Sequence, residues 1–271
     1  MKECIQPYYI KNGNILDCQS FDLKLINEGK SVYEVIRLSG TKLLFLRDHL
    51  DRLYKSLDLA CITPWIDGKD ISGQLEELIN KNNAREGNLK IVMNSRPGSG
   101  NHFLAYFVAH RYPSEKDYKN GVKVILFPFE RKDPNTKVWR PEFRAKVAEE
   151  LQKCQAFEAL LLDSEECLPE ASKANIFAVK GNNIITAPEE FILPGITRKY
   201  VLEICKEMGI SVHKRKISLN EIPDLDGLFL TGTSLHVLPV NSVNNIRLST
   251  DNRIMKKLMK KFENILFNHL R

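Results

Sequence analysis

The sequence predicts an α+β fold with mixed or antiparallel sheets and flanking helices. Strand-like runs come in pairs joined by short polar turns, as at 32–38 with 42–46 and at 174–179 with 184–186. Helical patterns stand between these pairs without strict strand–helix–strand alternation. The chain has 271 residues, 43% of them hydrophobic and 27% charged, which is typical of a globular protein with one large domain or two modest ones.

The first part of the chain mixes strands with helices. A turn at Ser39-Gly40-Thr41 joins the first two strands. Asp48 begins a helix, because the apolar residues that follow it recur at helical spacing. We expect a second helix over 71–82 and strands over 89–93 and 103–109.

The polar segment 113–121, with its proline and glycine, is the predicted linker between a smaller domain at 1–112 and a larger one at 122–271. In the larger domain Gly209 ends a helix in the usual position. The predicted elements are strands at 122–127, 158–163, 174–179, 184–186 and 228–230 and helices at 142–154, 197–208 and 254–270.

Charge and apolar patterning exclude several classes. The net charge of +6 is mild, and the densest basic cluster (Lys256, Lys257, Lys260 and Lys261) fits the solvated face of a helix, so we expect no nucleic-acid partner. No apolar run reaches the length of a membrane span, and the N-terminal segment lacks the pattern of a secretory signal.

Cysteine and histidine usage indicates neither disulfides nor a metal. The six cysteines include no CxxC pair and lie mostly among apolar residues, as expected for reduced thiols in a cytoplasmic protein. The six histidines never stand at metal-ligand spacing.

Three features could each bind an anion. In Leu193-Pro194-Gly195-Ile196-Thr197-Arg198 a helix begins after a turn, so Thr197 either caps its own helix or binds a phosphate. Thr231-Gly232-Thr233-Ser234 is a second hydroxyl-rich turn after a buried strand. Arg52 stands beside the apolar stripe of a helix, as either a solvated arginine or a bidentate phosphate ligand. Alone, each feature is ambiguous.

Several segments occur in one order. In one-letter code they are VYEVIR (32–37), HLDRL (49–53), EALLLD (158–163), the E-x-x-x-x-N-I-F segment that starts at Glu170, LPGITR (193–198) and TGTS (231–234). On these segments the chain resembles the fold-type IV enzymes that depend on pyridoxal 5'-phosphate (PLP). These are the class IV aminotransferases, of branched-chain and D-amino-acid type, and their relative aminodeoxychorismate lyase. The resemblance covers about residues 27–245.

The resemblance implies a two-domain, D-amino-acid-aminotransferase-like enzyme whose larger domain binds PLP. The family's PLP-binding lysine precedes the EALLLD-type strand, and Lys137, 21 residues before Glu158, is the match. Lys137 would hold PLP as an imine and move the substrate's Cα proton, and Glu170 would keep the pyridine nitrogen protonated. The residues implied to hold the phosphate are Arg52, Ile196, Thr197 and Thr233.

The resemblance also implies substrates and an assembly. The substrates are an amino acid and a 2-oxo acid, and the chain would form a homodimer. Tyr33 would face the active site, while Arg37 and Arg96 are candidates for binding the substrate carboxylate.

The chain departs from the family pattern at three points, one of which is the turn at 164–169 before the glutamate, where the usual glycine is missing and Pro169 stands. Ala171 follows the glutamate where a glycine is usual, and no tyrosine follows Lys137, which leaves Arg140 as a donor to the cofactor's ring oxygen. The alternative activity is that of aminodeoxychorismate lyase, whose members often carry threonine at the position of Val35. A cofactor-free scaffold is a third alternative, disfavoured because the lysine, glutamate and phosphate residues are all present.

Overall fold

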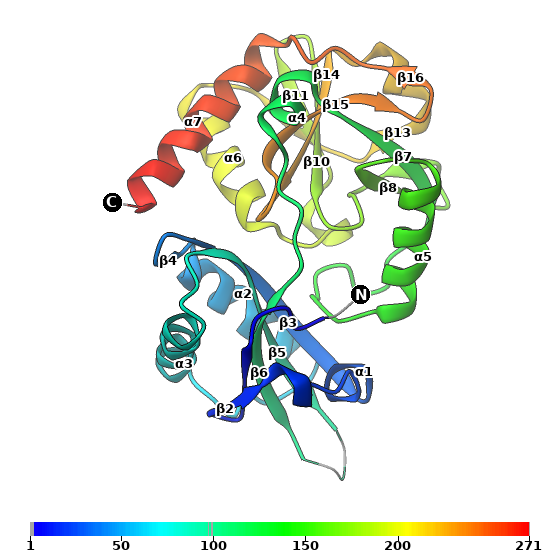
Figure 1. The fold of residues 1–271 in the computed structure, drawn as a ribbon. Helices are drawn as coiled ribbons and strands as arrows, with labels where there is room; N and C mark the ends of the chain where they lie inside the picture. Colours follow the sequence, from blue (N-terminus) through cyan, green and yellow to red (C-terminus); the bar gives the residue numbers. More distant parts are fainter. Residues whose placement is uncertain (1–2, 97, 99, 271) are drawn as a thin grey trace. The chain divides into compact units, whose positions relative to one another are not determined.

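The computed structural model describes residues 3–96, 98 and 100–270, which form two compact units (Figure 1). Unit 1 comprises Met1–Arg111, Thr136–Pro141 and His269–Arg271, and unit 2 comprises Tyr112–Asn135 and Glu142–Asn268. The predicted linker lies at the start of unit 2 and contains helix α4 (Glu115–Asn120).

Unit 1 is built on a six-stranded sheet in the order β2-β1-β6-β5-β3-β4, in which every pair is antiparallel. Its strands are β1 (Tyr8–Lys11), β2 (Asn14–Asp17), β3 (Lys30–Ser39), β4 (Lys42–Leu43), β5 (Glu86–Ser95) and β6 (His102–Val108). The long β3–β5 pairing runs in unbroken register from Lys30 opposite Ser95 to Ser39 opposite Glu86.

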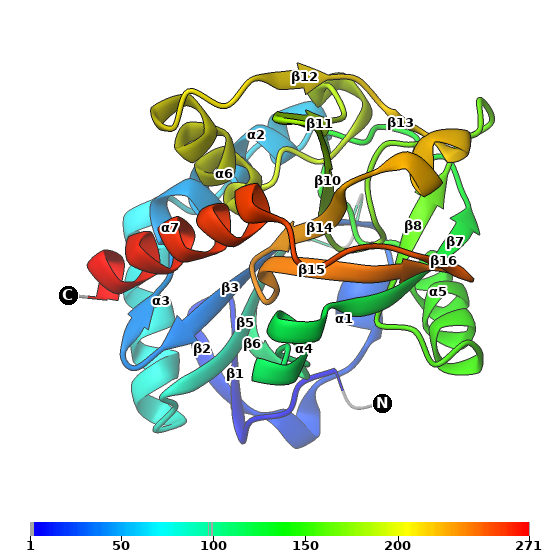
Figure 2. The same ribbon diagram turned by 90° about the horizontal axis from the view of Figure 1, so that it is seen from above.

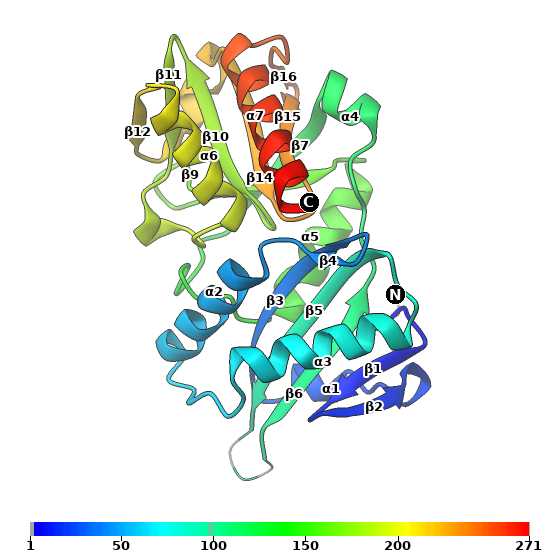
Figure 3. The same cartoon turned by 90° about the vertical axis from the view of Figure 1, so that its left-hand side faces the viewer.

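Helices cover this sheet because its strands alternate apolar side chains between two faces. On one face, Val32, Ile36 and Leu89 pack with α2 (Leu46–Leu59) and α3 (Gly68–Lys81), which lie beside the sheet in Figure 3. The other face carries Tyr33, Val92 and Tyr106. It packs with the N-terminal segment and with α1 (Lys24–Asn27), which follows a short 3-10 helix, Cys18–Ser20.

Helix α2 begins earlier than its sequence predicts. Its N-cap is Phe45, which has a left-handed φ of 54°, and not a residue next to Asp48. The apolar stripe that predicted the helix does face the core, since Leu53 and Leu57 are fully buried. The apolar stripe therefore predicts the presence of the helix correctly, but not the residue at which it begins.

Unit 2 is built on an eight-stranded mixed sheet. The order is β12-β11-β10-β14-β15-β7-β8, with β16 paired to β15, and a separate pair joins β13 to β9. The strands are β7 (Val122–Pro128), β8 (Glu158–Leu162), β9 (Cys167–Leu168), β10 (Asn175–Lys180), β11 (Asn183–Thr186), β12 (Val212–Lys214), β13 (Ile217–Ser218), β14 (Gly227–Gly232), β15 (His236–Val243) and β16 (Ile246–Arg247).

Three helices pack on this sheet through apolar stripes. Helix α5 (Pro141–Lys153) buries Phe143 and Val147 against β7 and β8. Helices α6 (Ile196–Glu207) and α7 (Arg253–Leu270) lie side by side in all three views, most clearly in Figure 2, and Lys261 pairs with Glu207 between them at 3.8 Å. Short 3-10 helices occupy Glu189–Phe191 and Leu219–Asp224.

The predicted fold class is confirmed. The unit 1 sheet is antiparallel, and the unit 2 sheet combines antiparallel pairs with parallel ones, namely β7 with β8, β7 with β15 and β11 with β12. Within the described ranges, no helix is both long enough and apolar enough to cross a membrane.

Candidate active site

Lys137 lies on a short segment, residues 136–141, that we call the lysine strap. The strap belongs to unit 1 and runs along β3. The Tyr33 amide donates to the Lys137 carbonyl oxygen at 3.1 Å, and the Trp139 amide donates to the Ser31 carbonyl oxygen at 2.8 Å. Strand β4 pairs only with the far end of β3, so these backbone groups at the start of β3 are available to the strap.

The Lys137 side chain is placed beside Tyr33. Its Nζ atom lies 5.1 Å from the centre of the Tyr33 ring. Its amide donates to the Ser56 hydroxyl of α2 at 3.3 Å, a second attachment to unit 1. The predicted catalytic lysine and the predicted substrate-facing tyrosine are therefore neighbours.

A buried carboxylate holds Arg52 in the same unit. The Arg52 guanidinium donates from Nε and Nη2 to the two oxygens of Glu34, both at 2.7 Å, and His49 Nδ1 lies 2.8 Å from Glu34 Oε2. The Glu34 side chain is fully buried and that of Arg52 is 10% exposed. A guanidinium has five N–H donors, so the bidentate pair orients Arg52 while using only two of them.

Electrostatics fix the charges of this cluster. Burial raises the pKa of Glu34. The Arg52 charge, hydrogen bonds from His49 and Arg52, and the Lys137 charge outweigh burial and hold this pKa well below its usual range. Burial lowers the pKa of His49, which the hydrogen bond to Glu34 only partly offsets. We infer an ionised Glu34 and a neutral His49 that donates its Nδ1 proton to Glu34.

In unit 2, Glu170 is a second buried carboxylate in a fixed position. Its side chain is 3% exposed and pairs with Arg131, whose Nε lies 2.8 Å from Oε1. The Leu193 amide donates to Oε2 at 3.0 Å. Since Glu170 also bridges to Asn175 at the start of β10, both its backbone and its carboxylate are held.

The start of α6 is pinned to β10. Asn175 Nδ2 donates to the Leu193 carbonyl oxygen at 2.9 Å, and a Cβ at Gly195 would lie 1.9 Å from Asn175 Oδ1, so only glycine fits. Gly195 is the N-cap and has no side chain to offer. The interpretation of Thr197 as the cap of its own helix is therefore wrong. Thr197 lies within the first turn and is 3% exposed.

The end of β14 lies next to this helix start. Thr231 pairs with Asn175 across the sheet, and β14 ends at Gly232, directly before Thr233. The Thr231 hydroxyl is buried and has no hydrogen-bond partner in the part of the chain that the structure describes. Unit 2 thus carries the predicted phosphate residues Ile196 and Thr197 at the start of α6 and Thr233 directly after β14.

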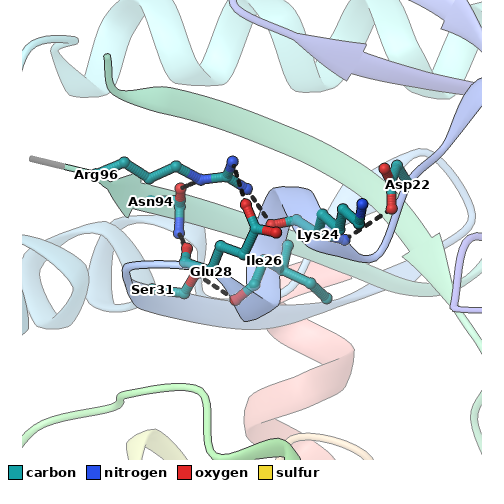
Figure 4. A network of polar contacts seen from close by, with 7 residues as sticks. All are labelled: Asp22, Lys24, Ile26, Glu28, Ser31, Asn94 and Arg96. Atoms are coloured by element: carbon teal, nitrogen blue, oxygen red, sulfur yellow. Dashed lines mark hydrogen bonds and ion pairs between the residues drawn. The ribbon is translucent and has the colours of Figure 1, made fainter. Parts of the chain in front are cut away.

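The two predicted carboxylate-binding arginines both belong to unit 1. Arg37 is partly buried on β3, opposite Asn88 of β5. Arg96 follows β5 and donates to Asn94, to Glu28 and to the Lys24 carbonyl oxygen (Figure 4). Its guanidinium is committed to these partners.

Comparison with known sequences decides the family. The family described as "Amino-transferase class IV" matches residues 31–243 of this chain. The chain belongs to the class IV aminotransferases. The match runs from β3 to the end of β15 and so includes Lys137, Glu170 and the start of α6.

Three similar proteins illustrate the family. The chain is 30% identical over 226 residues to the D-alanine aminotransferase of Bacillus licheniformis, which covers 80% of each chain. It superposes with a TM-score of 0.85 and 21% identity on the branched-chain aminotransferase of the archaeon Thermoproteus uzoniensis with norvaline, covering 98% of this chain and 96% of the other. The chain also superposes on the structure of a putative 4-amino-4-deoxychorismate lyase of Legionella pneumophila. The TM-score is 0.77 at 24% identity, and the superposition covers 87% of this chain and 91% of the other.

Sequence reasoning missed four residues that organise this class IV aminotransferase. Glu34 and His49 orient Arg52, and their signal was a charged residue within a buried strand together with a histidine one helical turn before an arginine. Asn175 had a signal in the E-x-x-x-x-N spacing. Arg131 had none, because it stands in an irregular segment where spacing carries no information.

Proposed function

We propose that this class IV aminotransferase transfers an amino group between an amino acid and a 2-oxo acid, of branched-chain or D-amino-acid type, with PLP bound to Lys137. When bound, the cofactor would supply an electron sink for the bond to the substrate's Cα. The protein supplies the tether, the proton carrier, the charge opposite the ring nitrogen and the phosphate site.

The residues of unit 2 fit such a cofactor. The start of α6 has backbone amides and the positive end of a helix dipole, with no side-chain cap at Gly195. The unpartnered, buried Thr231 hydroxyl belongs to the residue paired with Asn175, whose side chain lies against Gly195. We assign the phosphate to Ile196, Thr197 and Thr233, and we keep Arg52 as a further proposed phosphate ligand from the family resemblance.

Glu170 is assigned to the ring nitrogen. The Leu193 amide and Arg131 orient its carboxylate, and a carboxylate beside the pyridine nitrogen would favour the protonated form of that nitrogen. Leu193 binds both Glu170 and Asn175, so this carboxylate and the start of α6 keep a fixed separation. This coupling is the observation that carries the proposal, because a cofactor with a ring and a phosphate needs both ends held at once.

In unit 1, Lys137 is assigned as the catalytic residue. Its amine would hold the cofactor and, once displaced by the substrate, move the proton at Cα. Tyr33 lies against this amine, and the buried Glu34 places a negative charge near it. We keep Tyr33 and Arg37 as the proposed substrate contacts.

Absorbance spectroscopy tests this assignment by following the uptake of added PLP. The wild-type protein should gain the band of a protonated imine on addition of PLP, and Lys137→Ala should lose it. Lys146→Ala, an exposed lysine on α5, is the matched control and should keep the band. A wild-type protein that never gains the band would support the cofactor-free scaffold.

A substrate panel separates the two activities. With several amino donors and one 2-oxo acid, the proposal predicts amino transfer. Release of pyruvate from aminodeoxychorismate in the absence of any 2-oxo acid would assign the lyase activity instead. The fold allows this outcome, because the putative lyase of Legionella pneumophila has a similar structure.

We also propose a homodimer in the cytoplasm. The dimer follows from the family resemblance, and light scattering of the purified protein tests it. The six cysteines are free thiols, which suits a reducing compartment.

A further inference from the structure

The indole of Trp139, two residues after Lys137, is held from three directions. Its Nε1–H donates to Asn27 Oδ1 at 2.9 Å. The Lys90 ammonium lies 3.4 Å from the ring centre, within cation–π range. The Tyr33 ring meets it edge-on, with centroids 5.6 Å apart and an interplanar angle of 89°.

Lys90 is itself fixed beneath the strap. Its side chain is 2% exposed, and its Nζ atom lies 2.7 Å from Glu3 Oε1, which also accepts the Tyr106 hydroxyl at 3.3 Å. A buried ammonium needs such a partner, because an unpaired charge in this position would be strongly destabilising. The ammonium group that Lys90 offers to the Trp139 ring is therefore stable in position.

The hydrogen-bond acceptor of the indole, Asn27, lies at the end of α1, and Arg96 holds that end. Arg96 Nη1 donates to Glu28 Oε2 and Nε donates to Asn94 Oδ1, both at 3.0 Å, and Nη2 donates to the Lys24 carbonyl oxygen. Figure 4 shows the Arg96 guanidinium between Asn94, Glu28 and the Lys24 carbonyl oxygen, with dashed lines to all three.

A second set of bonds continues from Asn94 to the start of β3. Asn94 Nδ2 donates to the Glu28 carbonyl oxygen at 2.8 Å and to the Ser31 hydroxyl at 2.9 Å. The Ser31 hydroxyl donates to the Ile26 carbonyl oxygen at 2.8 Å. The residues on both sides of Asn27 are thus tied to β5, and the backbone oxygen of Ser31 receives the Trp139 amide.

We infer that Arg96, Asn27 and Trp139 are positioning residues for Lys137, acting through the backbone of the lysine strap. Arg96 fixes the turn that carries Asn27, Asn27 fixes the indole, and the indole with its amide fixes the strap. A lysine whose backbone is fixed loses less freedom when its amine takes up a reactive position. The consequence for catalysis rests on the proposed function, whereas the coupling itself does not. This role replaces that of Arg96 as a substrate ligand.

The first test measures amide hydrogen exchange in the strap, on the protein without added cofactor. Asn27→Ala removes the acceptor and Trp139→Phe removes the donor while keeping an aromatic ring. Each should raise exchange at the backbone amides of positions 137 and 139 by about fivefold, the effect of losing one neutral hydrogen bond. Arg96→Ala should also raise exchange at these two amides, because Arg96 acts on the strap through Asn27.

Conservative and matched variants make this test specific. Asn27→Asp keeps an acceptor oxygen and should restore slow exchange. Asn80→Ala, an exposed position on α3, should leave the strap unchanged. Unchanged strap exchange in Asn27→Ala and Arg96→Ala would overturn the inference.

The second test uses steady-state kinetics of the PLP-loaded protein. Positioning residues should lower kcat in Asn27→Ala and Arg96→Ala with little change in KM for the amino donor, and Asn27→Asp should recover kcat. A raised KM in Arg96→Ala together with unchanged strap exchange would return Arg96 to the substrate carboxylate. Failure to take up PLP contradicts the proposed function and leaves the exchange result standing.

Discussion

At the scale of single residues, the decisive feature is the buried Glu34 between Arg52 and His49. Arg52 could not hold its place without this carboxylate, because a buried guanidinium needs a partner. The HLDRL motif predicts Arg52 as a site residue but gives no reason for its orientation. The orienting carboxylate lies on another element, 18 residues earlier in the chain, where sequence spacing gives no guide.

Glu34→Gln tests this pairing. The amide keeps the shape of the side chain but leaves Arg52 without a counter-charge, so the free energy of unfolding should fall by about 3 kcal/mol. Urea denaturation measures it. Glu86→Gln, an exposed position on β5, should change stability by less than about 0.5 kcal/mol. Equal effects of the two substitutions would contradict the pairing.

Burial of His49 should make the free energy of unfolding depend on pH. Its pKa is lowered from 6.5 in the folded protein, so below pH 6.5 the unfolded chain takes up a proton that the folded chain does not. Stability is therefore present above pH 6.5 and lost as pH falls toward 5. His49→Gln should flatten that loss by up to about 1.4 kcal/mol per pH unit.

Unfolding free energies at pH 5, 6 and 7 measure this effect. His110→Gln, at an exposed histidine, should keep the wild-type slope. A slope in His49→Gln identical to that of the wild type would mean that folding does not lower the pKa of His49, which would contradict its burial as a neutral imidazole.

At the scale of elements, the sequence predicted the helices and hairpins well, but it did not predict which segment lies along the edge of the unit 1 sheet. The apolar stripes of α2 and α6 and the β10–β11 hairpin follow from local periodicity. The lysine strap has no such periodicity. It is placed in unit 1 because β4 is too short to pair with the start of β3, whose backbone groups bind the strap instead.

Gly195→Ala tests the junction of β10 and α6. The added Cβ meets Asn175 Oδ1, so Asn175 or the helix start must move, and the free energy of unfolding should fall by about 2 kcal/mol. Gly73→Ala in α3 is the matched control. Nothing lies within 4 Å of its Cβ, so alanine should instead stabilise the protein by about 0.5 to 1 kcal/mol. Two effects of the same sign would contradict the close approach.

At the scale of the whole molecule, the fold class was predictable and the strand order was not. Pairing of β15 with β7 joins strands that are far apart in the chain, and no local pattern encodes such a choice. The resemblance to a family supplied what periodicity could not, since it linked Lys137, Glu170 and LPGITR as parts of one site.

Chemical trapping identifies the lysine that carries the cofactor, which we propose to be Lys137. The PLP-loaded protein is reduced with borohydride, digested and analysed by peptide mass spectrometry. We expect a phosphopyridoxyl group on the peptide that contains Lys137. A group on another lysine, such as Lys132 or Lys146, or no adduct at all, would contradict it.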